Sequence, residues 1–220
     1  MLVGTWRTVK RAGLSESEIR AIFISMNEII TMPGVREAVL SFWYGGLDAS
    51  DTESMQPFWF KSTPELDADI RERFLEIYSV VKSGRLDGDV ESADDYLATI
   101  IVLDQFPRNM FRGTADAFAT DPLARKWATQ AVADGIDQLL PAPNRRMFIY
   151  LPFEHTEDMG GQNESVRLFE KMGFDGLTTY AYAHRDVIAA YGRFPHRNKA
   201  LGRVSTPEEE QYLNQPGAGF

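Results

Sequence analysis

The sequence predicts an all-α protein built of antiparallel helical hairpins. Helix start signals recur along the chain, in which threonine, serine or aspartate is followed by proline or by acidic residues. Apolar residues then repeat three and four positions apart, which places them on one helix face. No stretch between turn signals shows the sustained apolar–polar alternation that is typical of strands. We therefore expect about eight to ten helices, and their mostly short loops favour antiparallel neighbours.

The first two helices are marked at both ends. After Pro33, apolar residues such as Val35 and Trp43 fall on one face, and Gly45-Gly46 ends the segment. Thr63-Pro64-Glu65 is a strong start for the second helix. Threonine can cap the helix, proline fits its first turn, and the acid is favoured at the positive end of the helix dipole. This helix is expected to end at Gly84.

In the middle of the chain the sequence predicts the beginning of two further helices and the end of one. Ser92 can cap a helix whose apolar stripe ends at Asp104. Proline lacks an N–H and crowds the preceding turn, so Pro107 is expected to stop this helix. Asp104 would then lie at a helix C-terminus, where the dipole disfavours it, and Arg108 is its nearest partner. Asp121-Pro122 begins the next helix.

The remaining helices are predicted from the same signals. Pro152 is expected to follow a helix through Tyr150 and to start a new turn that carries Glu154 and His155. Further helices are expected at residues 162–172, from Thr178 or Thr179 to Tyr191, and from Thr206-Pro207 onward.

Two short segments repeat one pattern about ninety residues apart. They read Gln-Phe-Pro-Arg-Asn at residues 105–109 and Arg-Phe-Pro-His-Arg-Asn at residues 193–198, and we call them the two Phe-Pro motifs. Each follows a helical segment and offers the hydrogen-bond donors of arginine and asparagine just after a proline. Burying so many polar groups singly would be costly, so we expect the two motifs to meet in space.

Composition limits the classes of function. The 220 residues suit one domain, and the 44% apolar and 25% charged residues are those of an ordinary globular protein. The net charge of −9 argues against general nucleic-acid binding, which needs a basic face. The absence of cysteine excludes disulfides and thiolate chemistry, and no apolar run is long enough to predict a transmembrane helix.

Residues 1–32 differ from the rest and are predicted to be an N-terminal appendage, which leaves residues 33–220 as a single helical domain. Residues 1–32 show no apolar segment followed by a small-residue cleavage site, so they do not predict a secretory signal. Their acidic residues also speak against a transit peptide. A cytoplasmic location is therefore expected, and residues 1–31 are expected to be dispensable for folding.

The three histidines all lie beside charged residues, which makes them candidates for acid–base chemistry. A metal site is disfavoured, because no two histidines have the i, i+3 or i+4 spacing of helical ligands and the neighbouring arginines would repel a cation. No glycine-rich phosphate loop or nucleophile elbow is present, and no cofactor is predicted.

Several ordered motifs resemble the bacterial domain of unknown function 924 family. They are the residues 39–45, 103–109 with Arg112-Gly113, 150–158, 184–186, 192–198 and 201–209 without residue 204. The resemblance covers roughly residues 34–220. It implies a tetratricopeptide-like helical fold, either a right-handed array or a compact bundle, and it implies no established activity.

Two functions from different classes follow from the polar motifs. The first is a binding module for a small anionic ligand or a peptide, with candidate ligand-binding residues Asp104, Arg108, Asn109, Arg193, His196, Arg197 and Asn198. The second is a small-molecule enzyme that uses a histidine and a carboxyl group, with candidates His155, His184, His196 and Glu154. The same arginines could instead pair with Asp104, Glu154, Glu157 and Asp158 to lock helix ends together. A closed pocket with two histidines and a perturbed carboxyl group would favour the enzyme.

Overall fold

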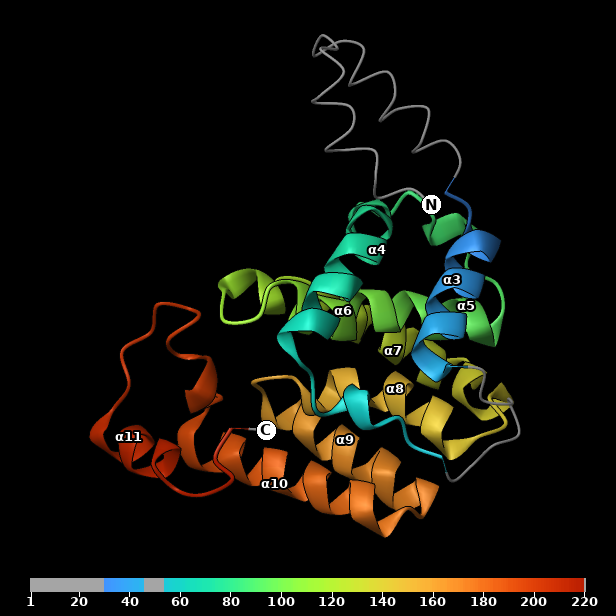
Figure 1. Ribbon diagram of the computed structural model, residues 1–220. Helices are drawn as coiled ribbons and strands as arrows, with labels where there is room; N and C mark the ends of the chain where they lie inside the picture. Colours follow the sequence, from blue (N-terminus) through green and yellow to red (C-terminus); the bar gives the residue numbers. More distant parts are fainter. Residues whose placement is uncertain (1–29, 46–53, 220) are drawn as a thin grey trace, which may run out of the picture.

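The computed structural model describes residues 30–45 and 54–219, and these residues form helices and loops without any strand (Figure 1). The all-α prediction is confirmed. The appendage predicted at residues 1–32 lies almost wholly outside the described residues. None of the described helices is long and apolar enough to cross a membrane. The tetratricopeptide-like arrangement stays a prediction.

The α-helices, in chain order, are α3 (Met32–Tyr44), α4 (Pro64–Lys82), α5 (Ala93–Ile100), α6 (Phe106–Met110), α7 (Asp121–Ala133), α8 (Pro143–Glu154), α9 (Met159–Met172), α10 (Asp175–Tyr191) and α11 (Pro207–Leu213). Short 3-10 turns occur at η1 (Pro57–Trp59), η2 (Asp87–Asp89), η4 (Ala115–Phe118), η5 (Ile136–Leu139) and η6 (Pro195–Arg197). The segment η3 (Ile101–Gln105) is a π-helical turn that joins α5 to α6.

The continuous helix formed by α5, η3 and α6 is the centre of the fold. It contacts α3 and α4, and it also contacts α7 and α8. The helix α9 packs against both α8 and α10, so these three helices extend the fold on the other side of the central helix (Figure 1). The turn η6 and α11 follow α10 at the C-terminal end of the chain, and they contact each other.

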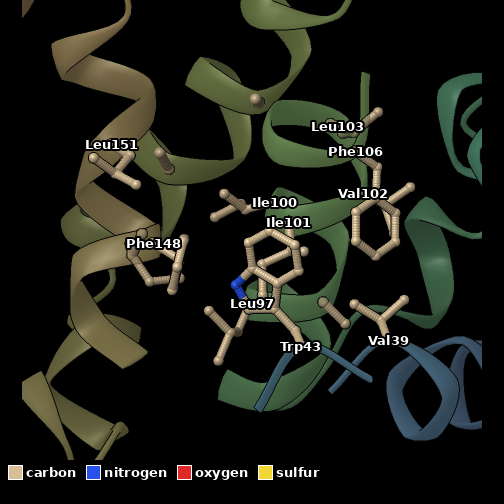
Figure 2. Packing of buried hydrophobic residues seen from close by; sticks show 14 of the residues in the cluster. Val39, Trp43, Leu97, Ile100, Ile101, Val102, Leu103, Phe106, Phe148 and Leu151 are labelled. Carbon is tan, nitrogen blue, oxygen red and sulfur yellow. The ribbon is translucent and has the colours of Figure 1, made fainter. Parts of the chain in front are cut away.

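The hydrophobic core lies where these elements meet. Leu97, Ile100 and Ile101 of the central helix are fully buried, and in Figure 2 they lie around Trp43, with Phe148 to one side of them. The Trp43 ring meets the Phe148 ring edge-on at 5.4 Å, a favourable aromatic geometry. Trp59 closes this cluster, because its indole N–H donates to the carbonyl of Trp43 at 2.8 Å.

The first described helix begins at Met32, before the segment after Pro33 in which the sequence predicts it. Thr31 caps α3, with its side chain accepting from the N–H of Gly34. Met32, which the sequence prediction assigned to the appendage, is 1% exposed and belongs to the core. Gly45 ends the helix in the left-handed region, with φ of 59°, as a glycine at this position permits.

The prediction that Pro107 stops its helix is wrong. The chain continues through the π turn η3 into α6, and Pro107 lies in the first turn of α6, where its missing N–H costs least. In a regular α-helix the carbonyl of Leu103 would lose its partner to this proline. The hydroxyl of Thr120 donates to that carbonyl at 2.6 Å instead. Asp104 therefore lies within a helix and not at its end.

The Thr120 hydroxyl gives a test of this account. We expect Thr120→Val to lower the free energy of unfolding by about 1–3 kcal/mol, because it removes a donor from a buried carbonyl while it keeps the volume of the side chain. The matched control is Thr99→Val, since Thr99 is similarly buried and the hydrogen bond of its hydroxyl among the described residues is a weak one, to the Met32 sulfur at 3.9 Å. Urea unfolding of both variants measures the difference, and equal losses would contradict the account.

Three further helix boundaries differ from the prediction, and one of them is the start of α9 at Met159, three residues before the expected residue 162. Pro152 lies inside α8 and does not start a new turn. Burial of Phe148, Leu151 and Phe153 on either side outweighs its cost of roughly 3 kcal/mol. The helix α10 begins at Asp175, because the hydroxyls of Thr178 and Thr179 donate to carbonyls four residues back and do not cap the helix.

Candidate active site

A cavity of about 770 Å³ lies among α6, α8, α9, α10 and η6. Its volume is that of typical small-molecule sites. Its apolar lining consists of Met55, Trp59, Phe60, Ala117, Phe118, Met147, Leu151, Phe169, Phe174 and Leu177. Its polar lining consists of Ser62, Gln105, Arg108, Asn109, Arg112, Glu154, His155, Tyr180, His184, His196 and Arg197, and two glycines complete the wall. A second cavity, of about 500 Å³ among α3, α5 and α8, contains none of the predicted site residues.

Asp104, which is buried, and His155, which is partly exposed, form a pair at the wall of the large cavity. The π turn carries Asp104, which is fully buried, and His155 follows the last residue of α8. The Nδ1 atom of His155 lies 2.8 Å from Oδ1 of Asp104. Burial opposes ionisation of Asp104, but Arg108 and His155 hold its pKa down at about 2. An ionised carboxylate only accepts, so Nδ1 carries the proton and Nε2 is the proton acceptor of the ring.

The protonation state of His155 follows from its surroundings. Burial and the nearby Arg108 lower the pKa of His155, while Asp104 opposes this shift. His155 is therefore a neutral imidazole near pH 7. The side-chain amide of Gln105 also donates, from Nε2 to Oδ2 of Asp104, at 2.5 Å. This hydrogen bond holds the second oxygen of the carboxylate. The π turn thus supplies both the carboxylate and one of the donors that orient it.

Glu154 and His184 form a second, buried pair beside the first. Nδ1 of His184 donates to the carbonyl of Tyr180 at 2.8 Å and lies 3.2 Å from Oε1 of Glu154. Burial raises the pKa of Glu154 to about 8, with a further contribution from Asp104. Burial likewise lowers the pKa of His184 to about 3. Near pH 7 both groups are therefore mostly neutral, and Glu154 holds a proton that it can donate.

The two Phe-Pro motifs meet on one carboxylate. Arg108 binds Asp121 through two hydrogen bonds of 2.9 and 3.0 Å, and Nη1 of Arg197 donates to the same carboxylate at 3.2 Å. We call this arrangement the Asp121 clamp. Asp121 is the first residue of α7, where the helix dipole favours a negative charge. Burial and Arg108 lower the pKa of Arg197 to about 10, so Arg197 stays cationic near pH 7.

Three of the predicted ligand-binding residues have structural partners. Asn109 lines the cavity, but its amide donates to Ser62 and Asp67. Arg193 and Asn198 lie outside the cavity lining, and both bind the carboxylate of Glu209. They fasten α11 to the end of α10. The alternative that arginines lock helix ends together thus describes Arg193, although its partner is Glu209 and not one of the four expected carboxylates, and the expected pairing of Arg108 with Asp104 is present at 3.4 Å.

The third histidine, His196, also lines the cavity. Burial and the neighbouring Arg197 lower its pKa to about 4, so it is neutral near pH 7. All four predicted catalytic candidates, Glu154, His155, His184 and His196, therefore lie on one cavity. Among the residues that the structure describes, no three histidine or acidic side chains converge in a way that could hold a metal ion.

Comparison with known proteins places the chain in a family. A family model described as bacterial protein of unknown function (DUF924) matches residues 39–217. The chain belongs to this family. It is also similar to a solved structure, that of the protein of unknown function ATU0120 from Agrobacterium tumefaciens, with 38% sequence identity and a TM-score of 0.75. The similarity covers 84% of this chain and 99% of ATU0120. No curated protein matches the chain.

Sequence reasoning missed several residues of the site. Asp121 was read only as a helix start, although a carboxylate that begins a helix between two arginine-rich motifs is a natural partner for both. Gln105 belongs to the first Phe-Pro motif, but nothing in the pattern indicated that it would hold Asp104. The aromatic wall formed by Phe118 and Phe169 carried no signal that separates it from ordinary core packing.

Proposed function

We propose that this DUF924 protein is a small-molecule enzyme that uses general acid–base catalysis in the large cavity. The observation that carries the proposal is the Asp104–His155 pair at the wall of that cavity. A buried, ionised carboxylate that binds Nδ1 of a histidine fixes the tautomer and the orientation of the ring. A histidine with a purely structural role does not need a fixed tautomer. Here the fixed ring lies beside a cavity of about 770 Å³, the size of a small-molecule site.

In this proposal His155 is the general base. Its Nε2 accepts a proton from the substrate or from a water molecule in the cavity, and the negative charge of Asp104 stabilises the imidazolium that forms. Asp104 acts through His155 and is a positioning residue. The neutral resting state of His155 supports this role, because only the neutral ring can take up a proton.

Glu154 is the proposed general acid. Its pKa of about 8 keeps it protonated near neutral pH, so it can give a proton to a leaving or developing basic group. Two titratable groups at one cavity whose surroundings drive their pKa values in opposite directions are typical of acid–base pairs in active sites. His155 is shifted down and Glu154 is shifted up.

The second candidate function is ligand binding without a reaction. The observation in its favour is that Arg108, Arg112 and Arg197 all line the cavity. A cavity with a cationic wall would hold an anionic ligand whether or not the ligand is converted.

The proposal is tested by a search for turnover. Purified protein is incubated with a metabolite extract from a bacterium, and consumed and formed compounds are identified by mass spectrometry. We expect His155→Asn to reduce the rate of any conversion by about 100-fold or more, because asparagine can still bind Asp104 but has no atom in the place of Nε2.

The control for this experiment is Asp137→Asn. Asp137 is buried and accepts a hydrogen bond from Tyr150, but it is not part of the cavity lining, so turnover should persist. Undiminished conversion by His155→Asn would contradict the proposal. Retention of a ligand from the extract without any conversion by the wild-type protein would favour the binding function.

A further inference from the structure

We infer that the cavity takes a small molecule with an apolar body and one oxyanion, a carboxylate or a phosphate ester, which Arg197 binds. This inference deepens the proposed function, because it names the substrate class of the same cavity. It rests on the charge of the cavity wall, on the hydrogen bonds of Arg197 and on the placement of the apolar lining.

The wall of the cavity is cationic. Its charged side chains are Arg108, Arg112 and Arg197, while the carboxylates that pair with these arginines belong to Asp67, Asp104 and Asp121, none of which lines the cavity. The carboxyl group that does line it is Glu154, which burial keeps mostly protonated near pH 7. A bound oxyanion would thus contact the arginines directly, while the aspartates that pair with these arginines lie behind the cavity wall.

Arg197 has more donors than partners. Its side chain is 7% exposed, yet the only hydrogen bond it makes within residues 30–45 and 54–219 runs from Nη1 to Asp121. Asp121 is already held by two shorter bonds from Arg108. The Nε atom of Arg197 is buried and has no hydrogen-bond partner among these residues. An unmet guanidinium donor at a cavity wall is costly unless a ligand supplies the acceptor.

Two aromatic rings lie beside Arg197. Its guanidinium carbon lies 4.6 Å from the centre of the Phe118 ring and 4.5 Å from that of Phe194. Both distances are those of cation–π contacts, which hold the guanidinium, and its hydrogen-bond donors lie along its edge. The edge is where guanidinium binds a carboxylate or phosphate through two parallel hydrogen bonds. The side chain is therefore held in place before the ligand arrives.

The apolar body of the ligand has its own wall. Leu151 of α8, Phe169 of α9, and Phe174 and Leu177 at the start of α10 line the cavity with apolar surface. Burial of an apolar group against such side chains stabilises binding by about 25 cal/mol for each Å² removed from water. A small inorganic anion would leave this surface uncovered, which is why the inference names an apolar body.

The inference is tested with four probes that share a phenyl body. They are 4-phenylbutyrate, phenyl phosphate, the neutral 4-phenylbutyramide and the cationic 4-phenylbutylamine. Isothermal titration calorimetry on the full chain should give 4-phenylbutyrate or phenyl phosphate an affinity at least about tenfold above that of the amide. The stronger of these two oxyanions identifies the class. Equal binding of acid and amide, preference for the amine, or no binding of any probe at millimolar concentration would overturn the inference.

A variant locates the oxyanion. Arg197→Met keeps an apolar stem between the two rings and leaves Asp121 paired with Arg108, so the fold should persist. It should lower the affinity for the preferred oxyanion to that of the amide and leave amide binding unchanged. The matched control is Arg185→Met, because Arg185 of α10 pairs with its neighbour Asp186 and does not line the cavity. An oxyanion preference retained in Arg197→Met would contradict the role of Arg197.

The probe experiment remains decisive if Arg197→Met does not fold, since the comparison of acid and amide uses the wild-type protein. It is also independent of catalysis. Oxyanion binding without turnover would support this inference and count against the enzymatic proposal. Turnover that depends on His155 but acts on a neutral substrate would do the reverse.

Discussion

Asp104→Ala is expected to lower the free energy of unfolding by about 3–5 kcal/mol, the largest effect of any single substitution considered for this protein. Asp104 is fully buried and accepts from His155 and Gln105, and Arg108 lies 3.4 Å away. Its removal leaves two buried donors unpaired and takes one negative charge from beside a buried guanidinium. Urea unfolding followed by circular dichroism measures the loss.

The control for Asp104→Ala is Asp137→Ala. Asp137 is also buried, but its partners Tyr150 and Gln138 are neutral, so we expect a smaller loss of about 1–3 kcal/mol. A loss for Asp104→Ala that is no larger than that of the control would show that the Asp104 cluster is not held by charge. The proposed ion pairing around the π turn would then be wrong.

Between pH 6.5 and 8, Glu154 is expected to lower the unfolding free energy of the wild-type protein by about 1.5 kcal/mol relative to Glu154→Gln, which lacks this group. In the unfolded chain a glutamate releases its proton near pH 4.3, whereas the buried Glu154 keeps it up to about pH 8. Over this interval Glu154 holds up to one proton more in the folded protein than in the unfolded chain. Its contribution to stability therefore falls as the pH rises, by up to about 1.4 kcal/mol per pH unit.

The lower limit of this interval is set by the histidines. His184 and His196 have pKa values lowered to about 3 and 4, so below pH 6.5 the unfolded chain binds protons that the folded protein does not. The contribution of these histidines to the unfolding free energy rises with pH, whereas that of Glu154 falls. Between pH 6.5 and 8 the histidines of the unfolded chain lose their remaining protons, and because this contribution is common to the wild-type protein and Glu154→Gln, the difference between the two proteins isolates Glu154.

Chemical denaturation at several values between pH 6.5 and 8 tests the prediction. Glu164→Gln is the control, because Glu164 pairs with Arg167 at the surface and its pKa is lowered, so it is ionised in both states. That variant should keep the wild-type dependence on pH. An undiminished dependence in Glu154→Gln would show that another group carries the proton.

Local signals in the sequence predicted most of the helices. Thr63, Ser92 and Thr206 each cap the helix that they were expected to cap, because a hydroxyl next to an apolar period needs only its own neighbours to act. Pro107 and Pro152 were misread for the opposite reason. Each is kept inside a helix by tertiary contacts, such as the Thr120 hydroxyl on Leu103, that no local pattern records.

The candidate site could be predicted only in part. The sequence indicated which residue types would gather, because two arginine-rich motifs in an acidic chain need partners. It could not tell which of them would face a cavity. Arg193 and Arg197 lie four residues apart in the same motif, yet the first fastens α11 through Glu209 and the second lines the cavity. That difference depends on how the chain turns at η6.

The Asp121 clamp also bears on the order of events during synthesis of the chain. The contact between Asp121 and Arg197 joins residues 76 positions apart, and Arg197 leaves the ribosome after the helices α3 to α10. The Asp104–His155 pair and the core around Trp43 use only residues that emerge earlier. A nascent chain can therefore bury its core while one wall of the cavity is still missing. A ligand that needs Arg197 would then bind only after this last wall of the cavity has been synthesised.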